Sequence, residues 1–383
     1  MTSASSDLVE RVRRRLAGSA AEATAQSVSR ALQEEPGVHD AGTVLAVVDV
    51  LRRESAGAGP LDALLAEPGV TDVLVNGTSS VHVDRGAGLE RADVRIESDA
   101  EVRRLAQRLA ARAGRRLDDA SPWVDARLPD GTRLHAVLAP LARPGTLISL
   151  RVPARRPFSL DDLERTRTVD AEGAAWLRRV VSERLAFVVS GGTGSGKTTL
   201  LGALLGLVDP RERIVVVEDS TELRPEHPHV VGLEARPANV EGAGLVTLRD
   251  LVRQALRMRP DRLVVGEVRG AEVAELLAAL NTGHEGGCGT IHANSAEDVP
   301  ARFEALGAAA GLSREAVHSQ LAAGLDLVVH LDRRGGRRVL RELAVLERSA
   351  DGLVRSRSAL VRHPAGWSEG PGLARLMGRV GRA

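Results

Sequence analysis

The sequence predicts an α/β protein whose larger part is a sheet covered by helices on both faces. Short apolar runs alternate with helical segments after residue 176, and a glycine-rich loop joins one such strand to a helix. Shorter strands with few helices precede this part. The expected order is a helical N-terminal extension (1–56), an α+β N-terminal domain (60–150), a linker (151–175), a nucleotide-binding domain (176–350) and an Arg/Gly-rich tail (351–383).

The composition is that of a folded protein that does not itself cross a membrane. Its 383 residues carry 52 basic and 51 acidic side chains, a formal charge of +1. This balance argues against a dedicated nucleic-acid coat. The single cysteine, Cys288, excludes an internal disulfide and suggests a reducing compartment. The apolar runs fall short of the roughly 20 residues of a membrane span, and the first residues lack the apolar core of a secretory signal.

The segments follow from periodicity and composition. Residues 1–56 carry apolar residues on one stripe, which predicts helices. Between 60 and 150, the strand-like runs VTDVLV, SVHVD, ADVRI, TRLHAVL and TLISLRV surround one helical run, ESDAEVRRLAQRLAARAG. Two prolines within 151–175 predict a hinge. The last 30 or so residues show little periodicity, which predicts a loosely held tail.

Lysine occurs once in the chain. One of the 52 basic residues is Lys197, so the other 51 are arginine (52 − 1 = 51). Position 197 should therefore require the compact ammonium group of lysine, which the planar guanidinium of arginine cannot replace. It lies in LAFVVSGGTGSGKTTLLGALLG, which matches the phosphate-loop pattern G-x-x-x-x-G-K-[ST].

Each part of this loop has a physical task in binding a nucleotide. Glycines let backbone amides surround an anion, and the helix that follows aims its positive dipole end at phosphate. Lys197 is expected on the β- and γ-phosphates and Thr198 on Mg²⁺. The expected nucleotide contacts are Gly191, Gly192, Thr193, Gly194, Ser195, Gly196, Lys197, Thr198 and Thr199.

Acidic residues end two strands of the same predicted sheet. Glu218 and Asp219 follow RIVVV, and Glu267 follows RLVVG. In an open α/β sheet, ligands gather at the carboxyl ends of the strands. Gly266 stands where an aspartate usually holds the metal in such proteins, so the metal-binding task shifts to Thr198, Glu218 or Asp219. Glu267 is the first choice for polarising the attacking water and Glu218 the second.

The segment NTGHEGGCGTIHANS places His284, Cys288 and His292 at intervals of four. Imidazole and thiolate are zinc ligands, but the intervening glycines make a continuous helix unfavourable and no fourth ligand is evident. We favour a turn that leads into a short strand, GTIH, and brings His292 toward the γ-phosphate as a sensor. A histidine that only satisfies a backbone carbonyl is the alternative.

The segments GGTGSGKTT, VVVEDSTEL, RQALRMRPDRLVVGEVRG and TGHEGGCGTIHANS resemble the Walker A, Asp-box, Walker B and His-box segments of the secretion ATPases, above all the Tad/CpaF-type branch. The resemblance covers roughly 60–350 and is most specific over 185–300. RLPDGTRLHAVLAP and LISLRVP resemble the part of that family's N-terminal domain that closes over nucleotide.

This resemblance implies a RecA-like core that hydrolyses ATP with Mg²⁺, assembled as a homo-hexameric ring. It implies catalytic roles for Lys197, Glu267, Glu218 and His292, and arginines from the N-terminal domain on the nucleotide, with Arg133 first and Arg127 and Arg151 next. The implied partner is a membrane-embedded platform protein of a pilus or secretion machine, which places the motor in the cytoplasm at the inner face of the plasma membrane. Exposed arginines also permit peripheral contact with anionic lipid, although the near-zero net charge favours it little.

Two other functions remain open at this point. A nucleic-acid motor, either a helicase or a conjugation-type DNA pump, would use a basic channel and aromatic stacking platforms, and an aromatic content of 2% disfavours it. No sequence-specific nucleic-acid contact is therefore expected. A nucleotide switch without turnover would follow if Gly266 has removed the activity.

Overall fold

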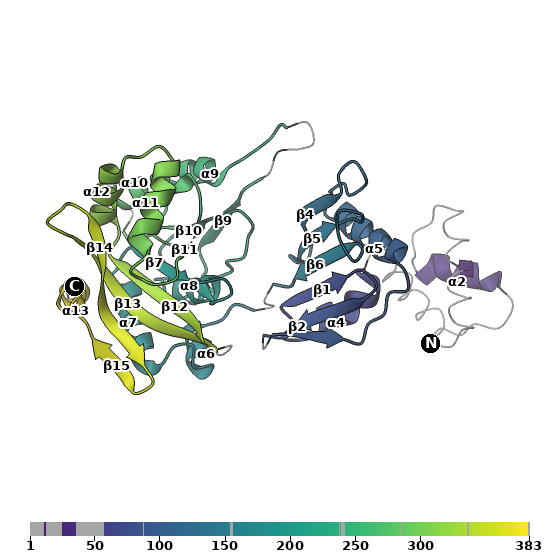
Figure 1. Cartoon of the computed structure of the whole chain (residues 1–383), viewed down its shortest axis with the longest axis horizontal. Coiled ribbons are helices and arrows are strands. Elements are labelled where there is room, and N and C mark those ends of the chain that lie inside the picture. Colours follow the sequence, from purple (N-terminus) through teal and green to yellow (C-terminus); the bar gives the residue numbers. More distant parts are fainter. Residues whose placement is uncertain are drawn as a thin grey trace. The chain divides into compact units, whose positions relative to one another are not determined.

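The computed structural model describes residues 11–12, 25–35, 57–86, 88–153, 156–236, 238, 242–283, 285–334 and 337–381. Contacts divide the chain into two compact units, Met1–Arg155 and Arg156–Ala383. Within the helical extension expected over 1–56, helix α2 (Ala25–Gln33) is described, and most of the other residues of that extension lie outside the described ones (Figure 1).

The first unit is a six-stranded antiparallel sheet that packs against one long helix. Its strands are β1 (Asp72–Asn76), β2 (Ser80–Asp84), β3 (Leu89–Ala92), β4 (Trp123–Arg127), β5 (Arg133–Val137) and β6 (Leu147–Arg151), in the order β3-β2-β1-β6-β5-β4. The 3-10 helix η1 (Gly59–Leu61) and helix α4 (Asp62–Ala66) precede them. Helix α5 (Asp99–Arg112) begins after Ser98, whose side chain accepts a hydrogen bond from the Glu101 amide. Its apolar side packs on alternate strand residues to form one core.

Two strands of this unit differ from the prediction. The run ADVRI was expected as a strand, but β3 ends at Ala92 and its residues are largely exposed. Strand β4 was not predicted because WVDAR mixes an aromatic with two charged residues. It lies at the edge of the sheet, where one row of side chains faces water and polar residues are tolerated.

The second unit is built on a nine-stranded sheet. Its strands are β7 (Phe187–Gly191), β8 (Ile214–Glu218), β9 (Val230–Glu234), β10 (Arg262–Val268), β11 (Cys288–His292), β12 (Leu327–Arg334), β13 (Arg337–Arg348), β14 (Val354–His363) and β15 (Gly366–Glu369), in the order β15-β14-β13-β12-β7-β11-β10-β8-β9. The strands from β12 to β9 in this order run parallel, and β13, β14 and β15 add to the β12 edge as antiparallel neighbours.

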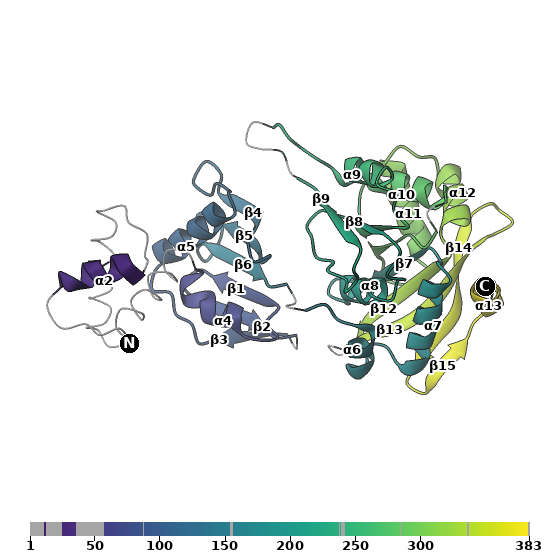
Figure 2. The same ribbon diagram turned by 180° about the vertical axis from the view of Figure 1, so that it is seen from behind.

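Helices cover both faces of this sheet, as the sequence predicts. On one face lie α6 (Leu160–Arg165), α7 (Ala171–Ser182), α8 (Lys197–Leu205) and α13 (Leu373–Val380); on the other lie α9 (Leu248–Ala255), α10 (Glu272–Leu280), α11 (Val299–Ala309) and α12 (Arg314–Gly324) (Figures 1 and 2). Alternate strand residues feed the two cores, because successive side chains point to opposite faces. Val216 and Val264 enter the first core, and Val217 and Val265 the second.

The structure corrects the expected linker and tail. Within 151–175, Ser159 and Asp162 form a capping box for α6, and Leu160, Leu163 and Val169 are buried in the first core. The expected tail instead forms β14, β15 and α13. Trp367 of β15 donates from Nε1 to both carboxylate oxygens of Asp170, which caps α7. Periodicity missed this region because β14 begins with arginine alternating with serine (VRSRS), which gives neither an apolar run nor an apolar–polar alternation.

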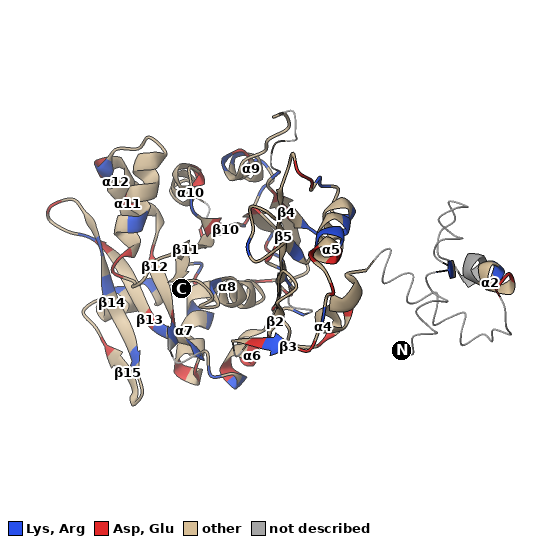
Figure 3. Ribbon diagram, turned by 45° about the vertical axis from the view of Figure 1, so that its right-hand side comes forward, with Lys and Arg blue, Asp and Glu red and all other residues tan. Residues whose placement is uncertain are grey.

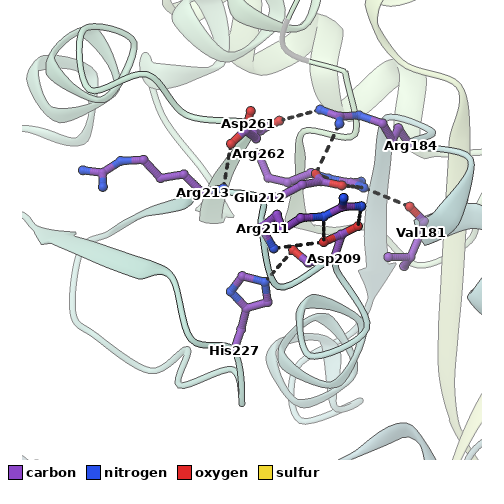
Figure 4. Close-up of polar contacts among 9 residues, drawn as sticks. All are labelled: Val181, Arg184, Asp209, Arg211, Glu212, Arg213, His227, Asp261 and Arg262. Atoms are coloured by element: carbon purple, nitrogen blue, oxygen red, sulfur yellow. Dashed lines mark hydrogen bonds and ion pairs between the residues drawn. The ribbon is translucent and has the colours of Figure 1, made fainter.

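A buried ion pair anchors the start of β10 at the amino ends of the strands. Arg262, 2% exposed, contacts Glu212 through Nε at 2.6 Å and donates from Nη2 to the Val181 carbonyl oxygen at 3.0 Å (Figure 4). Asp261 accepts a hydrogen bond from the Arg213 amide at 2.7 Å. These contacts join α7, the loop before β8 and β10 at the end of the sheet opposite to the phosphate loop.

Charged residues are spread over both units rather than gathered on one of them. Basic and acidic positions alternate along the ribbons in Figure 3. This pattern agrees with the small net charge of the chain. Among the helices within the described ranges, none combines the length and apolarity that a bilayer crossing requires.

Candidate nucleotide-binding site

The phosphate loop connects a buried strand to a helix, as its sequence requires. Strand β7 ends at Gly191, and α8 begins at Lys197. Gly194 and Gly196 have φ angles of +70° and +95°, in the left-handed region that favours glycine. A Cβ on Gly191 would lie 2.5 Å from the Leu331 carbonyl oxygen and 2.6 Å from Oγ of Ser195. The path of the loop therefore depends on glycine at these three positions.

Lys197 is seated inside the loop. Its side chain is buried, and Nζ donates to the carbonyl oxygens of Gly191 at 3.1 Å and Gly192 at 3.0 Å. Burial lowers the pKa of Lys197, and the negative charge of Glu267 opposes this shift. The ammonium is thus a compact charge among main-chain oxygens, an arrangement that a planar guanidinium does not reproduce.

Lys197, His292 and Glu267 form a connected series of polar groups. Nζ of Lys197 lies 3.4 Å from Nδ1 of His292, and Nε2 of His292 lies 2.9 Å from Oε1 of Glu267. Burial lowers the pKa of His292, and the charge of Lys197 lowers it further. Nζ of Lys197 also lies 3.3 Å from Nε2 of His292, so the imidazole ring stands between the ammonium and the Glu267 carboxylate.

Glu218 lies at the carboxyl end of β8 and is buried. Its Oε1 accepts hydrogen bonds from the amides of Glu222 and Leu223, each at 3.0 Å. Burial raises the pKa of Glu218 to about 7, even though these two hydrogen bonds lower it. A Cβ on Gly266 would lie only 2.6 Å from Cγ of Glu218. The glycine in β10 therefore leaves the space that the Glu218 side chain fills.

The other expected metal ligands lie in different surroundings. Asp219 forms an ion pair with Arg269, and Thr198 lies half-buried in the first turn of α8. In the part of the chain that the structure describes, no three or more His, Cys, Asp or Glu side chains are grouped to hold a metal ion. Mg²⁺ bound through nucleotide phosphates needs only one or two protein ligands. A loop hydroxyl and a carboxylate at the same edge of the sheet fit that class of site.

The Cys288 thiol is part of the apolar core. Cys288 begins β11 and is 2% exposed, and burial raises its pKa to about 12. It belongs to the same core as Phe187 of the adjacent strand β7 and Leu327 of β12, the strand beyond β7. His284 lies outside the described residues, and His292 contacts Lys197 and Glu267 instead. The spacing of four thus places Cys288 and His292 at the two ends of one strand.

The three arginines expected from the N-terminal domain stand in one row across the sheet of the first unit. Arg127 is directly opposed to Arg133, and Arg133 to Arg151. The row continues to Asp72, whose Oδ1 lies 3.2 Å from Nε of Arg151. Like charges directly opposed on neighbouring strands are unfavourable. The sheet therefore places three arginines and one aspartate in a single row.

Sequence reasoning missed two arginines that lie at the phosphate loop. Arg338 of β13 donates from Nε to the Gly194 carbonyl oxygen at 3.1 Å. In β12, Nη1 of Arg333 lies 3.3 Å from the position of a Cβ on Gly194. The only local signal is the basic segment RRGGRR at 333–338, which is far from the loop in sequence. Its proximity depends on β12 being the neighbour of β7 in the sheet.

Comparisons with known proteins identify the family of the chain. The family model of type II/IV secretion system proteins matches residues 54–342. A putative conjugal transfer protein of Mycobacterium tuberculosis is 59% identical over 320 residues, which cover 82% of this chain and 91% of that protein. The conjugal transfer protein TrbB of Rhizobium radiobacter is 33% identical over 285 residues, with 73% of this chain and 84% of TrbB covered.

Solved structures extend the likeness to the fold. The pilus retraction motor PilT, solved with bound ADP, superposes with a TM-score of 0.52 at 18% identity, over 84% of this chain and 85% of PilT. At this identity the likeness concerns the mixed α/β fold alone. The matched family model spans both units, and the first relative covers most of each chain. The chain therefore belongs to the type II/IV secretion system protein family.

Proposed function

We propose that this protein is an Mg²⁺-dependent ATPase that powers a secretion machine, with a RecA-like core in its second unit. The observation that carries the proposal is the buried position of Lys197 in the phosphate loop. The only lysine of the chain lies buried in a glycine-dependent loop, within reach of His292, which contacts Glu267. A compact cation, main-chain amides and a helix N-terminus at one place suit a polyphosphate.

The proposed roles follow from the chemistry of each residue. Lys197 would turn from the carbonyl oxygens of the loop to the phosphates, and Thr198 with Glu218 or Asp219 would hold Mg²⁺ directly or through water. The metal, when bound, neutralises charge on the phosphate oxygens. Glu267 would orient water, and His292 would register the terminal phosphate through its contacts with Lys197 and Glu267. Glu218, with a pKa near 7, is the alternative proton acceptor.

The arginine row of the first unit is proposed as a further source of positive charge for the nucleotide. Arg133 lies at the centre of the row, between Arg127 and Arg151. Its replacement by alanine should therefore weaken the ATPase more than the same change at either neighbour.

At the level of the machine, we propose a Tad/CpaF-type motor that assembles as a homo-hexamer. Release of phosphate contacts after hydrolysis would free one unit of each subunit to move relative to the other. A membrane-embedded platform protein at the inner face of the plasma membrane would receive this movement. The family of the chain and the names of its relatives, which include conjugal transfer proteins, support a transfer or secretion machine as the setting.

Phosphate release by the purified chain tests the enzymatic part. We expect slow Mg²⁺-dependent hydrolysis of ATP that Lys197→Ala and Glu267→Gln lower by about 10²-fold or more. Lys197→Arg should fail as well, because the guanidinium cannot occupy the same seat. Normal hydrolysis by Lys197→Arg would contradict the role given to the lysine. Light scattering with and without nucleotide tests the hexamer.

The names of two relatives favour a second setting, the transfer of DNA by conjugation. In that setting the ATPase would still act on protein components rather than on DNA. Stimulation of hydrolysis by single-stranded DNA would instead indicate a nucleic-acid motor. Tight ATP binding without phosphate release would indicate a switch without turnover.

A further inference from the structure

The phosphate loop has a second charged neighbour, the hairpin formed by β12 and β13. Strand β12 pairs in parallel with β7, and Leu331 is opposed to Gly191, so the hairpin continues past the point where the loop begins. Arg333 and Arg338 are directly opposed on the hairpin, and both side chains are exposed. Arg338 donates from Nε to the Gly194 carbonyl oxygen, and its Cδ lies 3.2 Å from the position that a Cβ on Gly196 would occupy.

The Arg338 contact acts on the direction of a loop amide. In a trans peptide, the carbonyl of one residue and the N–H of the next point in opposite directions. The hydrogen bond from Arg338 to the Gly194 carbonyl therefore also fixes the direction of the Ser195 N–H, whose nitrogen lies 3.4 Å from the Gly192 carbonyl oxygen. Glycine at 194 has the backbone freedom to adopt other orientations. An anion-binding nest requires backbone amides that are held in defined directions.

The two arginines also bring charge to the loop. Like charges that are directly opposed on antiparallel strands destabilise the pair, so an anion close to both would be stabilising. Arg338 uses Nε for the loop carbonyl, and its planar fork carries further donors on Nη1 and Nη2. Lysine carries all its donors on one nitrogen and lacks the planar fork, so it cannot place one donor on the loop carbonyl and separate donors on an anion in the same geometry.

We propose that Arg333 and Arg338 form a phosphate-binding element that the chain supplies to its own loop. The proposal rests on the proposed binding of nucleotide and specifies which part of the ligand is affected, the phosphates common to di- and triphosphates. Arg338 is a positioning residue that acts through the Gly194–Ser195 peptide. Arg333 adds a second cation beside Gly194.

Four variants of the full chain test this element. Arg338→Ala removes both the hydrogen bond and the charge, Arg338→Lys keeps the charge without Nε, and Arg333→Ala removes the second cation. Arg337→Ala is the matched control, since Arg337 is exposed on the same strand and is opposed to Arg334 rather than placed at the loop. The measurements are the dissociation constants of ADP and ATP, the inhibition constant of inorganic pyrophosphate against labelled ADP, kcat, KM and Tm.

Arg338→Ala should weaken ADP, ATP and pyrophosphate alike by about tenfold, with Tm near that of the wild type. Arg333→Ala should weaken all three ligands in the same direction. Arg338→Lys should recover little of the loss, and Arg337→Ala should stay within about twofold of wild type. KM should rise more than kcat falls, because the element acts on phosphate binding.

Three results would overturn the proposal. They are equal effects of Arg338→Ala and Arg337→Ala, full recovery by Arg338→Lys, and a loss of ADP affinity without loss of pyrophosphate affinity. Lys197→Ala separates this proposal from the proposed function. If Lys197→Ala abolishes nucleotide binding while Arg338→Ala behaves like the control, only the arginine element fails. If Lys197→Ala binds ATP normally, the proposed function fails first.

Discussion

The side chain of Glu218 fills the space that any side chain at Gly266 would need. The two residues lie on the adjacent strands β8 and β10, and a Cβ at 266 would come within 2.6 Å of Cγ of Glu218. An aspartate is expected at position 266 in proteins with a phosphate loop, and this chain has glycine there. The carboxylate of Glu218, on the neighbouring strand, occupies the space that the aspartate side chain would need.

Gly266→Asp should lower activity rather than improve it. The new side chain collides with Glu218 and adds a like charge, and overpacking of this kind costs about 1–3 kcal/mol. The double variant Glu218→Ala/Gly266→Asp removes the collision and should hydrolyse ATP faster than Glu218→Ala alone. Phosphate release and Tm of the three variants measure both effects. A double variant no more active than Glu218→Ala would show that the carboxylate cannot move between the strands.

Glu218 should make the stability of the second unit depend on pH. Burial raises its pKa from 4.5 to about 7, so the folded state binds more protons than the unfolded state between these values. This stabilising contribution is present below pH 4.5 and is lost as pH rises through 7. Glutamine at 218 has no charge to bury. The free energy of unfolding of Glu218→Gln, relative to that of wild type, should therefore rise by roughly 3 kcal/mol between pH 4.5 and 8. Thermal unfolding at a series of pH values measures the difference.

The matched control for this change is Glu226→Gln. Glu226 is exposed, so its difference from wild type should stay constant over the same pH range. A constant difference for Glu218→Gln as well would mean that the carboxylate is ionised at no cost in the folded chain.

Arg262→Leu should destabilise the second unit. The change removes the arginine that faces the Glu212 carboxylate at 2.6 Å, leaves that carboxylate with Arg184 at 3.5 Å, and leaves the Val181 carbonyl without the Arg262 donor, which together cost about 1–3 kcal/mol. Arg211→Ala is the control, because the Arg211–Asp209 pair in the same region is exposed at the arginine and surface pairs contribute little (Figure 4). Denaturant unfolding of both variants measures the contrast, and similar midpoints would contradict it.

Helix α13 should behave as part of the core. Leu376 is completely buried and Met377, its neighbour, is 49% exposed. Leu376→Ala should destabilise the unit by about 2–5 kcal/mol. Met377→Ala should have an effect within about 0.5 kcal/mol. Equal and small effects would restore the expectation of a loosely held tail.

The sequence could predict the parallel strands of the second unit and the residues that follow them, because each is marked by a short continuous stretch of the chain. The apolar runs ending at Gly191, Glu218 and Glu267 are buried on both sides, so they appear as continuous hydrophobic segments followed by functional residues. The glycines of the loop could be identified from the sequence because their pattern is that of a phosphate loop. His292 could be identified because it ends a short apolar run, like Glu218 and Glu267.

The parts that could not be predicted depend on contacts between distant segments. Arg338 meets Gly194 across 144 residues, and only the order of strands in the sheet brings them together. Among 51 arginines, no local pattern distinguishes it. Strand β14 was missed because Arg355 and Arg357 are exposed and alternate with half-buried serines, so only Ala359 and Leu360 of its middle form a short buried apolar run.

Because Lys197 is the single lysine of the chain and lies in the phosphate loop, chemical labelling of lysine can report whether a ligand is bound there. An amine-selective acylating reagent would find one lysine side chain in the whole protein, besides the α-amino group. Because burial lowers the pKa of this amine, a larger share of it is unprotonated and nucleophilic at neutral pH. Mass spectrometry of the acylated chain would then read the state of the loop at a single covalent mark, and a ligand seated there would shield it.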